Sequence, residues 1–168
     1  MPEKDTIYSS KIKYTGIFNF AEFYRFTYDW LMDETQLNHM EESKYKEKIK
    51  GDAKEVEVEW NGEKKITDYF RMEIKVEFRV LGLKKIEIVQ DGQKIKTNEG
   101  DVEVKVKGVL SRDYDAKFES NATKKWMRGI YEKFVIPSRI NEMEGKVAGW
   151  CDEFLTQSKA YLSLEGKS

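Results

Sequence analysis

Few residues of this sequence have the type and spacing that covalent or metal chemistry requires. His39 is the single histidine, and it lies in a polar stretch that lacks both the neighbouring ligands of a metal site and the paired nucleophile of a histidine-based mechanism. Cys151 is the single cysteine, and it falls on the apolar stripe of a helical segment, where a cysteine acts as a small core side chain. The sequence therefore predicts a protein that is not an enzyme and that holds neither a metal nor a cofactor.

One pair of acids has a spacing used in metal chemistry. Asp113 and Asp115, on either side of Tyr114, have the arrangement that holds a divalent cation in sugar-nucleotide enzymes. Strand alternation places both acids on the outer face of a strand end, and the fold expected for such enzymes is absent. We interpret them as solvated acids.

Two charged residues fall on strand faces that are otherwise apolar. Asp68 shares its face with Phe70, and Arg112 shares its face with Leu110 and Tyr114. A charge on a core face costs free energy unless it is paired, lies near the sheet end or lines a wet cavity. Two interpretations follow. Either both charges reach solvent at frayed strand ends, or Arg112, with Asp68 or Tyr114, binds the polar head of a ligand in a cavity.

Period-2 alternation predicts the antiparallel sheet that positions these residues. Two long strands are expected at Ile66–Leu81 and Asp101–Tyr114, with their even-numbered side chains on one buried face. Gly108 predicts a bulge or sharp bend within the second of them. The other strands are expected at Ile7–Tyr14, around Tyr45 and Ile49, at Val56–Trp60, at Ile86–Ile88 and at Ile95, with turns or breaks at Asn61-Gly62, Gly82, Asp91-Gly92 and Asn98–Gly100.

A helix is expected from about Phe20 to Glu34, opened by a capping box of Asn19 and Glu22. Aromatic residues occur nearly all round this helix, whereas one sheet face covers only one stripe. Some of them are therefore expected on the surface as an interface with a partner or a second copy. The alternative is that the loop Thr35–Ser43 or the segment around Pro137 covers the helix internally. The expected interface residues are Phe20, Tyr24, Tyr28 and Trp30.

The last part of the chain has a helical pattern. Pro137 removes a backbone donor and predicts a kink or a break, beyond which apolar residues at helical spacing predict a long amphipathic helix. Gly145 and Gly149 lie one turn apart in this helix, where each costs about 1 kcal/mol relative to alanine. They indicate either close packing against the sheet or two tolerated surface glycines.

Composition limits the classes of function. The 168 residues suit a single domain spanning 1–168, with 39% hydrophobic and 36% charged residues and a net charge of -1. This balance of charge disfavours nucleic acid as the main partner, and the abundance of Lys and Glu is typical of thermophilic proteins. No segment reaches the roughly 20 apolar residues that membrane insertion requires. The polar start and the single cysteine predict a reducing, cytoplasmic location.

The order of elements resembles the helix-grip fold of the START and pollen-allergen-like superfamily. The expected fold class is α+β, with a curved antiparallel sheet of about six or seven strands, an N-terminal helix and a long C-terminal helix packed on one face. The resemblance implies that the sheet wraps the last helix and that the cavity between them holds an apolar ligand.

Two functions remain open from the sequence. The first is a non-enzymatic protein that binds an apolar small molecule between the sheet and the last helix. The second is an interaction or structural protein that self-associates, or binds a protein partner, through aromatic helix surfaces. The strand faces opposite the last helix carry large Phe, Met, Ile and Val side chains, which fill a core and count against a cavity.

Overall fold

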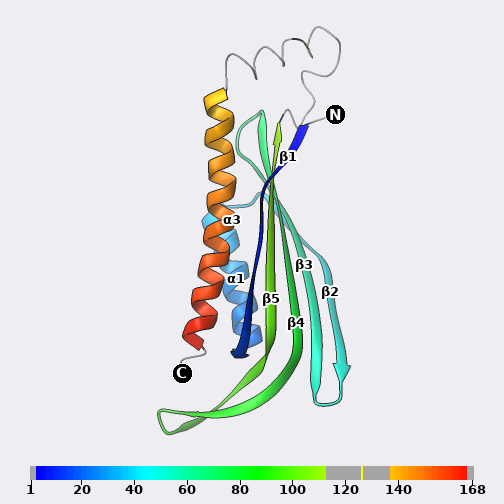
Figure 1. Ribbon diagram of the computed structural model, residues 1–168, viewed down its shortest axis with the longest axis vertical. Coiled ribbons are helices and arrows are strands. Elements are labelled where there is room, and N and C mark those ends of the chain that lie inside the picture. The colour runs from blue at the N-terminus through cyan, green and yellow to red at the C-terminus, as the bar shows by residue number, and fades with distance from the viewer. Residues whose placement is uncertain (1–2, 113–125, 127–136, 166–168) are drawn as a thin grey trace.

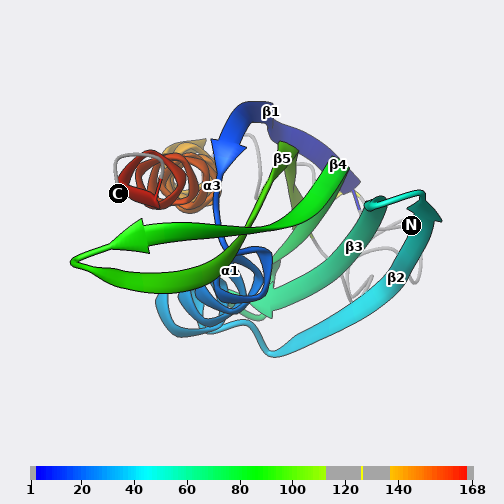
Figure 2. The same ribbon diagram turned by 90° about the horizontal axis from the view of Figure 1, so that it is seen from below.

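The computed structural model describes residues 3–112, 126 and 137–165. These residues form an α+β architecture in which one curved antiparallel sheet carries two helices on its inner face (Figures 1 and 2). The five strands lie in the spatial order first, fifth, fourth, third, second along the chain. The elements are β1 (Glu3–Ile17), α1 (Phe20–Thr35), β2 (His39–Lys50), β3 (Ala53–Lys65), β4 (Phe70–Gln90), β5 (Gln93–Arg112) and α3 (Pro137–Glu165).

The two long central strands, β4 and β5, alternate as the sequence predicts. Met72, Ile74, Val104 and Val106 are all buried on the face that carries the helices. The odd-numbered positions between them carry charged side chains on the opposite face, which we call the outer face. One buried face therefore extends along most of both strands, and the prediction that the even-numbered side chains form the core is confirmed.

Over the described ranges the sheet has five strands rather than the predicted six or seven, because two predicted breaks lie within continuous strands. Gly82 has a φ of 63° and lies where the β4–β5 pairing shifts register, between Leu81 and Lys84. β5 passes through Asn98–Gly100 without a turn, since Glu99 pairs with Lys84. These residues form a bulge, which bends the ladder instead of ending it (Figure 1). The tight turn at Asp91-Gly92 is confirmed.

The predicted hairpin turn at Asn61-Gly62 is wrong. Gly62 lies within β3, paired with Met40 on one side and Ile74 on the other. A Cβ atom on Gly62 would lie 2.7 Å from Leu37 Cδ1, so the glycine makes room for a buried leucine rather than for a turn. The chain reverses instead after Lys65, where the N–H groups of Ile66 and Thr67 donate to the Phe70 carbonyl at 3.0 and 3.1 Å. The separate turn between β2 and β3 is at Gly51, which has a φ of 63°.

Helix α1 begins where the sequence predicts and ends one residue later. Asn19 is the N-cap, and its side-chain oxygen accepts a hydrogen bond from the Glu22 N–H at 3.1 Å. Gln36 ends the helix in the left-handed conformation with a φ of 51°. The buried stripe of the helix consists of Phe20, Phe23, Thr27, Leu31 and Thr35.

Helix α3 contacts β1 and β5 along its buried stripe. The close approach depends on Gly108, where a Cβ atom would lie 2.7 Å from Cys151 Sγ and 2.9 Å from Val147 Cγ1. Gly108 is therefore a packing residue in a regularly paired strand. The bulge near it lies in β1, between Thr6 and Tyr8. The buried residues of α3 are Met143, Val147, Cys151, Phe154, Leu155, Ser158 and Leu162.

The glycines of α3 are surface residues. A Cβ atom on Gly145 or Gly149 would meet nothing within 4 Å, so the second interpretation of these glycines is correct. Pro137 is the first residue of α3, and the segment before it, which the predicted kink or break concerns, lies outside the described residues. Within the described residues, neither helix has a stretch long and apolar enough to cross a membrane.

The stability of the protein should respond in opposite ways to a methyl group added at the packed Gly108 and at the exposed Gly145. Gly108→Ala should lower the free energy of unfolding by about 1–3 kcal/mol, because Cys151 and Val147 would have to move. The matched variant Gly145→Ala should raise it by up to about 1 kcal/mol, because its methyl group meets open space in a helix. Urea denaturation of both variants measures the difference. Equal stability of the two variants would contradict this account of the contact between α3 and β5.

Candidate functional site

The aromatic residues of α1 form two sets that contact different parts of the chain. One set faces α3: Phe26 stacks on Tyr161 with ring centroids 4.6 Å apart, and Trp30 lies 5.9 Å from Phe154. The last helix, rather than the loop Thr35–Ser43, therefore covers this side of α1. Trp30 is half-buried as a result, although the sequence indicated that it is among the exposed interface residues.

The second set faces the hairpin formed by β2 and β3. Tyr24 and Tyr28 make T-shaped contacts with the buried Trp60, with centroid distances of 5.2 and 5.6 Å. Tyr45 from β2 lies 6.3 Å from Tyr24. Phe20 begins this set but is only 7% exposed, so its predicted place on the surface is wrong. Tyr28 is 39% exposed and Tyr45 is 47% exposed.

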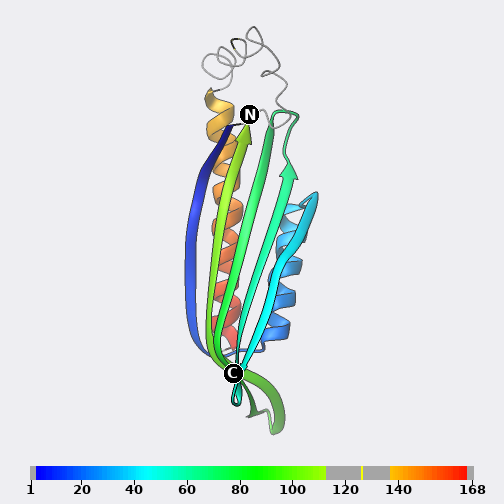
Figure 3. The ribbon, with the colours of Figure 1, turned by 90° about the vertical axis from the view of Figure 1, so that its right-hand side faces the viewer.

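These side chains border an open groove of about 920 Å³, which we call the tyrosine groove. It lies between α1 and the edge of the sheet formed by β2, which Figure 3 shows side by side. The rim carries both signs of charge. The groove is lined by Phe20, Ala21, Tyr24, Arg25, Tyr28 and Asp29 of α1, by Glu42, Tyr45 and Glu47 of β2, and by Lys54 of β3.

Carboxylates hold the polar ends of the tyrosines. Glu42 Oε1 accepts hydrogen bonds from the hydroxyl of Tyr24 and, at 3.3 Å, from Trp60 Nε1. Glu47 Oε1 accepts from the Tyr45 hydroxyl at 2.9 Å and from Lys54 Nζ at 3.2 Å. Both hydroxyl groups therefore have partners within the protein, and the ring faces are held in fixed orientations beside the groove.

The same contacts shift three pKa values. Burial, and then the hydrogen bond to Glu42, raises the pKa of Tyr24 to about 12. Burial and the hydrogen bond to Glu47 likewise raise the pKa of Tyr45 to about 12, and the hydrogen bonds from Tyr45 and Lys54 lower the pKa of Glu47. At neutral pH both phenols are protonated, so neither serves as a base.

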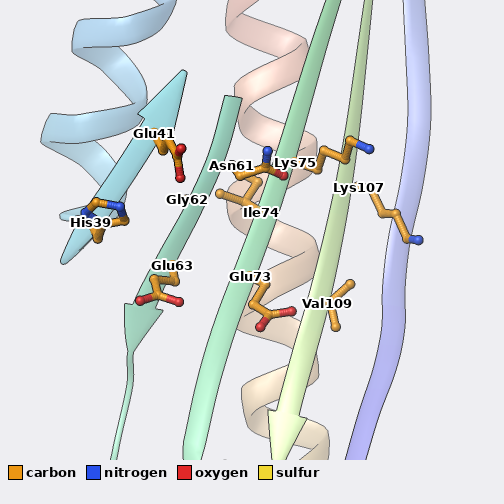
Figure 4. Close-up of a pocket in the computed structure, with 10 residues that line it drawn as sticks. All are labelled: His39, Glu41, Asn61, Gly62, Glu63, Glu73, Ile74, Lys75, Lys107 and Val109. Carbon is orange, nitrogen blue, oxygen red and sulfur yellow. The ribbon is translucent and has the colours of Figure 1, made fainter. Parts of the chain in front are cut away.

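A second hollow, of about 390 Å³, lies on the outer face of the sheet (Figure 4). Its charged side chains, including Glu63, Glu73, Lys75 and Lys107, are spread along four strands and do not converge on one point. Among the described residues, no group of three His, Cys, Asp or Glu side chains has the arrangement of a metal site. This hollow is therefore part of the charged outer face of the sheet.

The polar residues predicted on the inner sheet face occupy different surroundings. Arg112 forms an ion pair with Asp5 at 2.9 Å, at the end of the sheet. Asp68 is not on a strand: it lies in the turn between β3 and β4, its side chain is 81% exposed, and it pairs with Lys65 at 3.0 Å. Tyr114 lies outside the described residues, as do Asp113 and Asp115.

The two residues with potential for covalent chemistry are separate from the groove. His39 is the exposed first residue of β2, not a loop residue. Cys151 is fully buried, as its position on the apolar stripe predicts, and burial raises the pKa of its thiol to about 12. A protonated thiol in the core is a packing group rather than a nucleophile.

Sequence patterns missed Glu42, Tyr45 and Glu47 as site residues. The reason is a bulge between Glu42 and Lys44, which changes the parity of β2. Glu42 pairs with Trp60 and Tyr45 with Val58, so one even-numbered and one odd-numbered residue both face inward. A simple alternation count divides these residues between two faces, and only the structure brings them together.

The Tyr24–Glu42 contact predicts a change in stability at alkaline pH. An unfolded tyrosine ionises near pH 10 and folded Tyr24 near pH 12, so the stability linked to Tyr24 is present below pH 10 and is lost as the pH rises to about 12. Glu42→Gln should lower the pKa of Tyr24, whereas Glu41→Gln, a neighbouring control on the outer face, should not. Tyrosinate absorbance, taken as the difference between each protein and its Tyr24→Phe counterpart, measures this pKa. An unchanged value in Glu42→Gln would contradict the assignment.

The tyrosine groove combines exposed aromatic faces, a rim of mixed charge and an open shape. Its lining residues suit non-covalent binding of an elongated, partly apolar molecule. Comparisons with protein-family models, with curated proteins and with solved structures found no match to this chain.

Proposed function

We propose that this protein is a non-enzymatic interaction protein that binds a segment of a protein partner in the tyrosine groove. The observation that carries the proposal is the exposure of Tyr28 and Tyr45, at 39% and 47%, on the two walls of a groove of about 920 Å³. In a chain with 36% charged residues, such a concentration of aromatic surface in one groove supports a binding role.

The chemistry of tyrosine supports a protein partner. Tyrosine offers a large contact area with few rotatable bonds, and it contributes disproportionately to the affinity of protein interfaces. Contacts with Trp60 and with Glu42 already restrict Tyr24, so little side-chain entropy is lost when a partner binds. The charged rim, with Arg25 and Lys54 opposed by acids, supplies the polar border typical of such interfaces.

The alternative function, an apolar ligand between the sheet and α3, has less support. The helix-grip resemblance stays a proposal, which the strand order and the two helices on one face support only coarsely. Where α3 crosses β5, Gly108 is in contact with Cys151 and Val147, and Phe154 and Leu162 are buried. Large side chains fill this interface, and the proposed head-group residue Arg112 pairs with Asp5.

Peptide display tests the proposed function without a known partner. Peptides selected on the wild-type protein, after depletion on a Tyr28→Ser, Tyr45→Ser variant, should bind wild type at least about tenfold more tightly than that variant. The matched control is Val89→Ser, since Val89 is an exposed apolar residue that does not line the groove. Selected peptides that bind the double variant as tightly as wild type would contradict the proposal.

A further inference from the structure

We infer that the occupant of the tyrosine groove is an extended segment with alternating acidic and apolar side chains, which adds to the open edge of β2 as a further strand of the sheet. This inference rests on the proposed function and specifies the conformation and chemistry of the partner. It follows from the place of β2 in the sheet, from the charges on its outer face and from the strand that β2 already pairs with.

Strand β2 has an open edge. It is last in the strand order (Figure 3) and, within the part of the chain that the structure describes, it pairs only with β3. Every residue from Glu41 to Lys50 is exposed. The backbone of an edge strand presents N–H and C=O groups that an extended peptide satisfies by β-strand addition. The same strand carries Glu42, Tyr45 and Glu47 of the tyrosine groove, so the open edge and the groove are adjacent.

The outer face of β2 is a row of lysines. Lys44, Lys46 and Lys48 pair in register with Glu59, Glu57 and Glu55 of β3. Lys44 Nζ lies 2.6 Å from the Glu57 carboxylate, across one register step. Lys46 and Lys48 make no ion pair with the residues that the structure describes, so their ammonium groups are available to a strand on the other side.

Strand β3 shows which chemistry complements β2. Its outer positions carry Glu55, Glu57 and Glu59, and its inner positions carry the buried residues Val56, Val58 and Trp60. An added strand with the same alternation places its acids beside the lysine row. Its apolar side chains then lie beside Tyr45 and Ile49, which are 47% and 77% exposed. Burial of these side chains and pairing of the charges both favour such a strand.

A second copy of β2 fits this edge poorly. Antiparallel self-pairing over residues 44–50 brings the lysines at 44, 46, 48 and 50 opposite one another. Like charges directly opposite each other destabilise a strand pair, and edge lysines prevent such self-association. The lysine row therefore disfavours a copy of itself and favours an acidic strand.

A charge-reversal experiment tests the side-chain requirement. The probe is a fluorescent peptide of alternating Glu and Val with a central Trp, and its binding is measured by anisotropy. Lys46→Glu, Lys48→Glu should weaken binding at least about tenfold and should favour a peptide with Lys in place of Glu. The control Lys105→Glu, Lys107→Glu makes the same change of charge on the outer face of β5, away from the edge, and should bind like wild type. Equal binding of the acidic and basic peptides to wild type, or no binding of either, overturns the inference.

Backbone methylation tests the conformation. N-methyl groups on the alternate residues whose N–H groups point to β2 should abolish binding, whereas N-methyl groups on the intervening residues should be tolerated. Tolerance of both patterns overturns strand addition. The proposed function is judged separately, because display peptides that depend on Tyr28 and Tyr45 but not on Lys46 and Lys48 would support the groove and refute the strand.

Discussion

The rest of the architecture depends on the contact between α3 and β5 at Gly108, near the C-terminal end of that strand. Because Gly108 has no side chain, Cys151 and Val147 lie directly against the strand, and the whole helix is close to the sheet. In this position the C-terminal half of α3 contacts α1 through two aromatic pairs. Phe26 of α1 stacks on Tyr161, and Trp30 of α1 lies beside Phe154. With that side of α1 covered, Tyr24 and Tyr28 face the β2–β3 hairpin. Gly108, which does not line the tyrosine groove, is thus linked to it through the packing of α3 against α1.

Local sequence patterns predict most of the fold because strand alternation and helix capping determine most of its elements. The buried faces of β4 and β5 follow from period-2 alternation. The start of α1 follows from its N-cap Asn19, whose side-chain oxygen accepts a hydrogen bond from the Glu22 N–H. Local patterns fail at three of the glycines. Gly62, Gly82 and Gly108 serve a buried leucine, a bulge and a packed helix, respectively, whereas the sequence predicts a turn, a break and a bulge or sharp bend at these positions. A glycine's role depends on what lies across from it, and that is a property of the tertiary structure.

The candidate site is harder to predict than the fold. Three of the predicted aromatic residues, Phe20, Tyr24 and Tyr28, do line the groove, because helical spacing places them on one face. Their partners on β2 follow no pattern, since the bulge after Glu42 interrupts the alternation. The predicted polar residues Asp68 and Arg112 are explained by ion pairs with Lys65 and Asp5. An unusual residue is visible in the sequence, but the partner that shows whether it is structural is visible only in the fold.

The outer face of the β2–β3 hairpin also affects how the hairpin finds its register. The lysine row of β2 and the glutamate row of β3 both repeat every two residues, so a slip of two residues keeps lysines opposite glutamates. Exposed ion pairs contribute little free energy, and these pairs do not distinguish one register from the next. The distinction comes from features that occur once: the turn at Gly51, the bulge after Glu42, and the hydrogen bond from Trp60 to Glu42. Glu42 also accepts from Tyr24, so the same carboxylate that aligns the hairpin attaches it to α1. Alignment of the edge strand and assembly of the groove therefore depend on the same carboxylate.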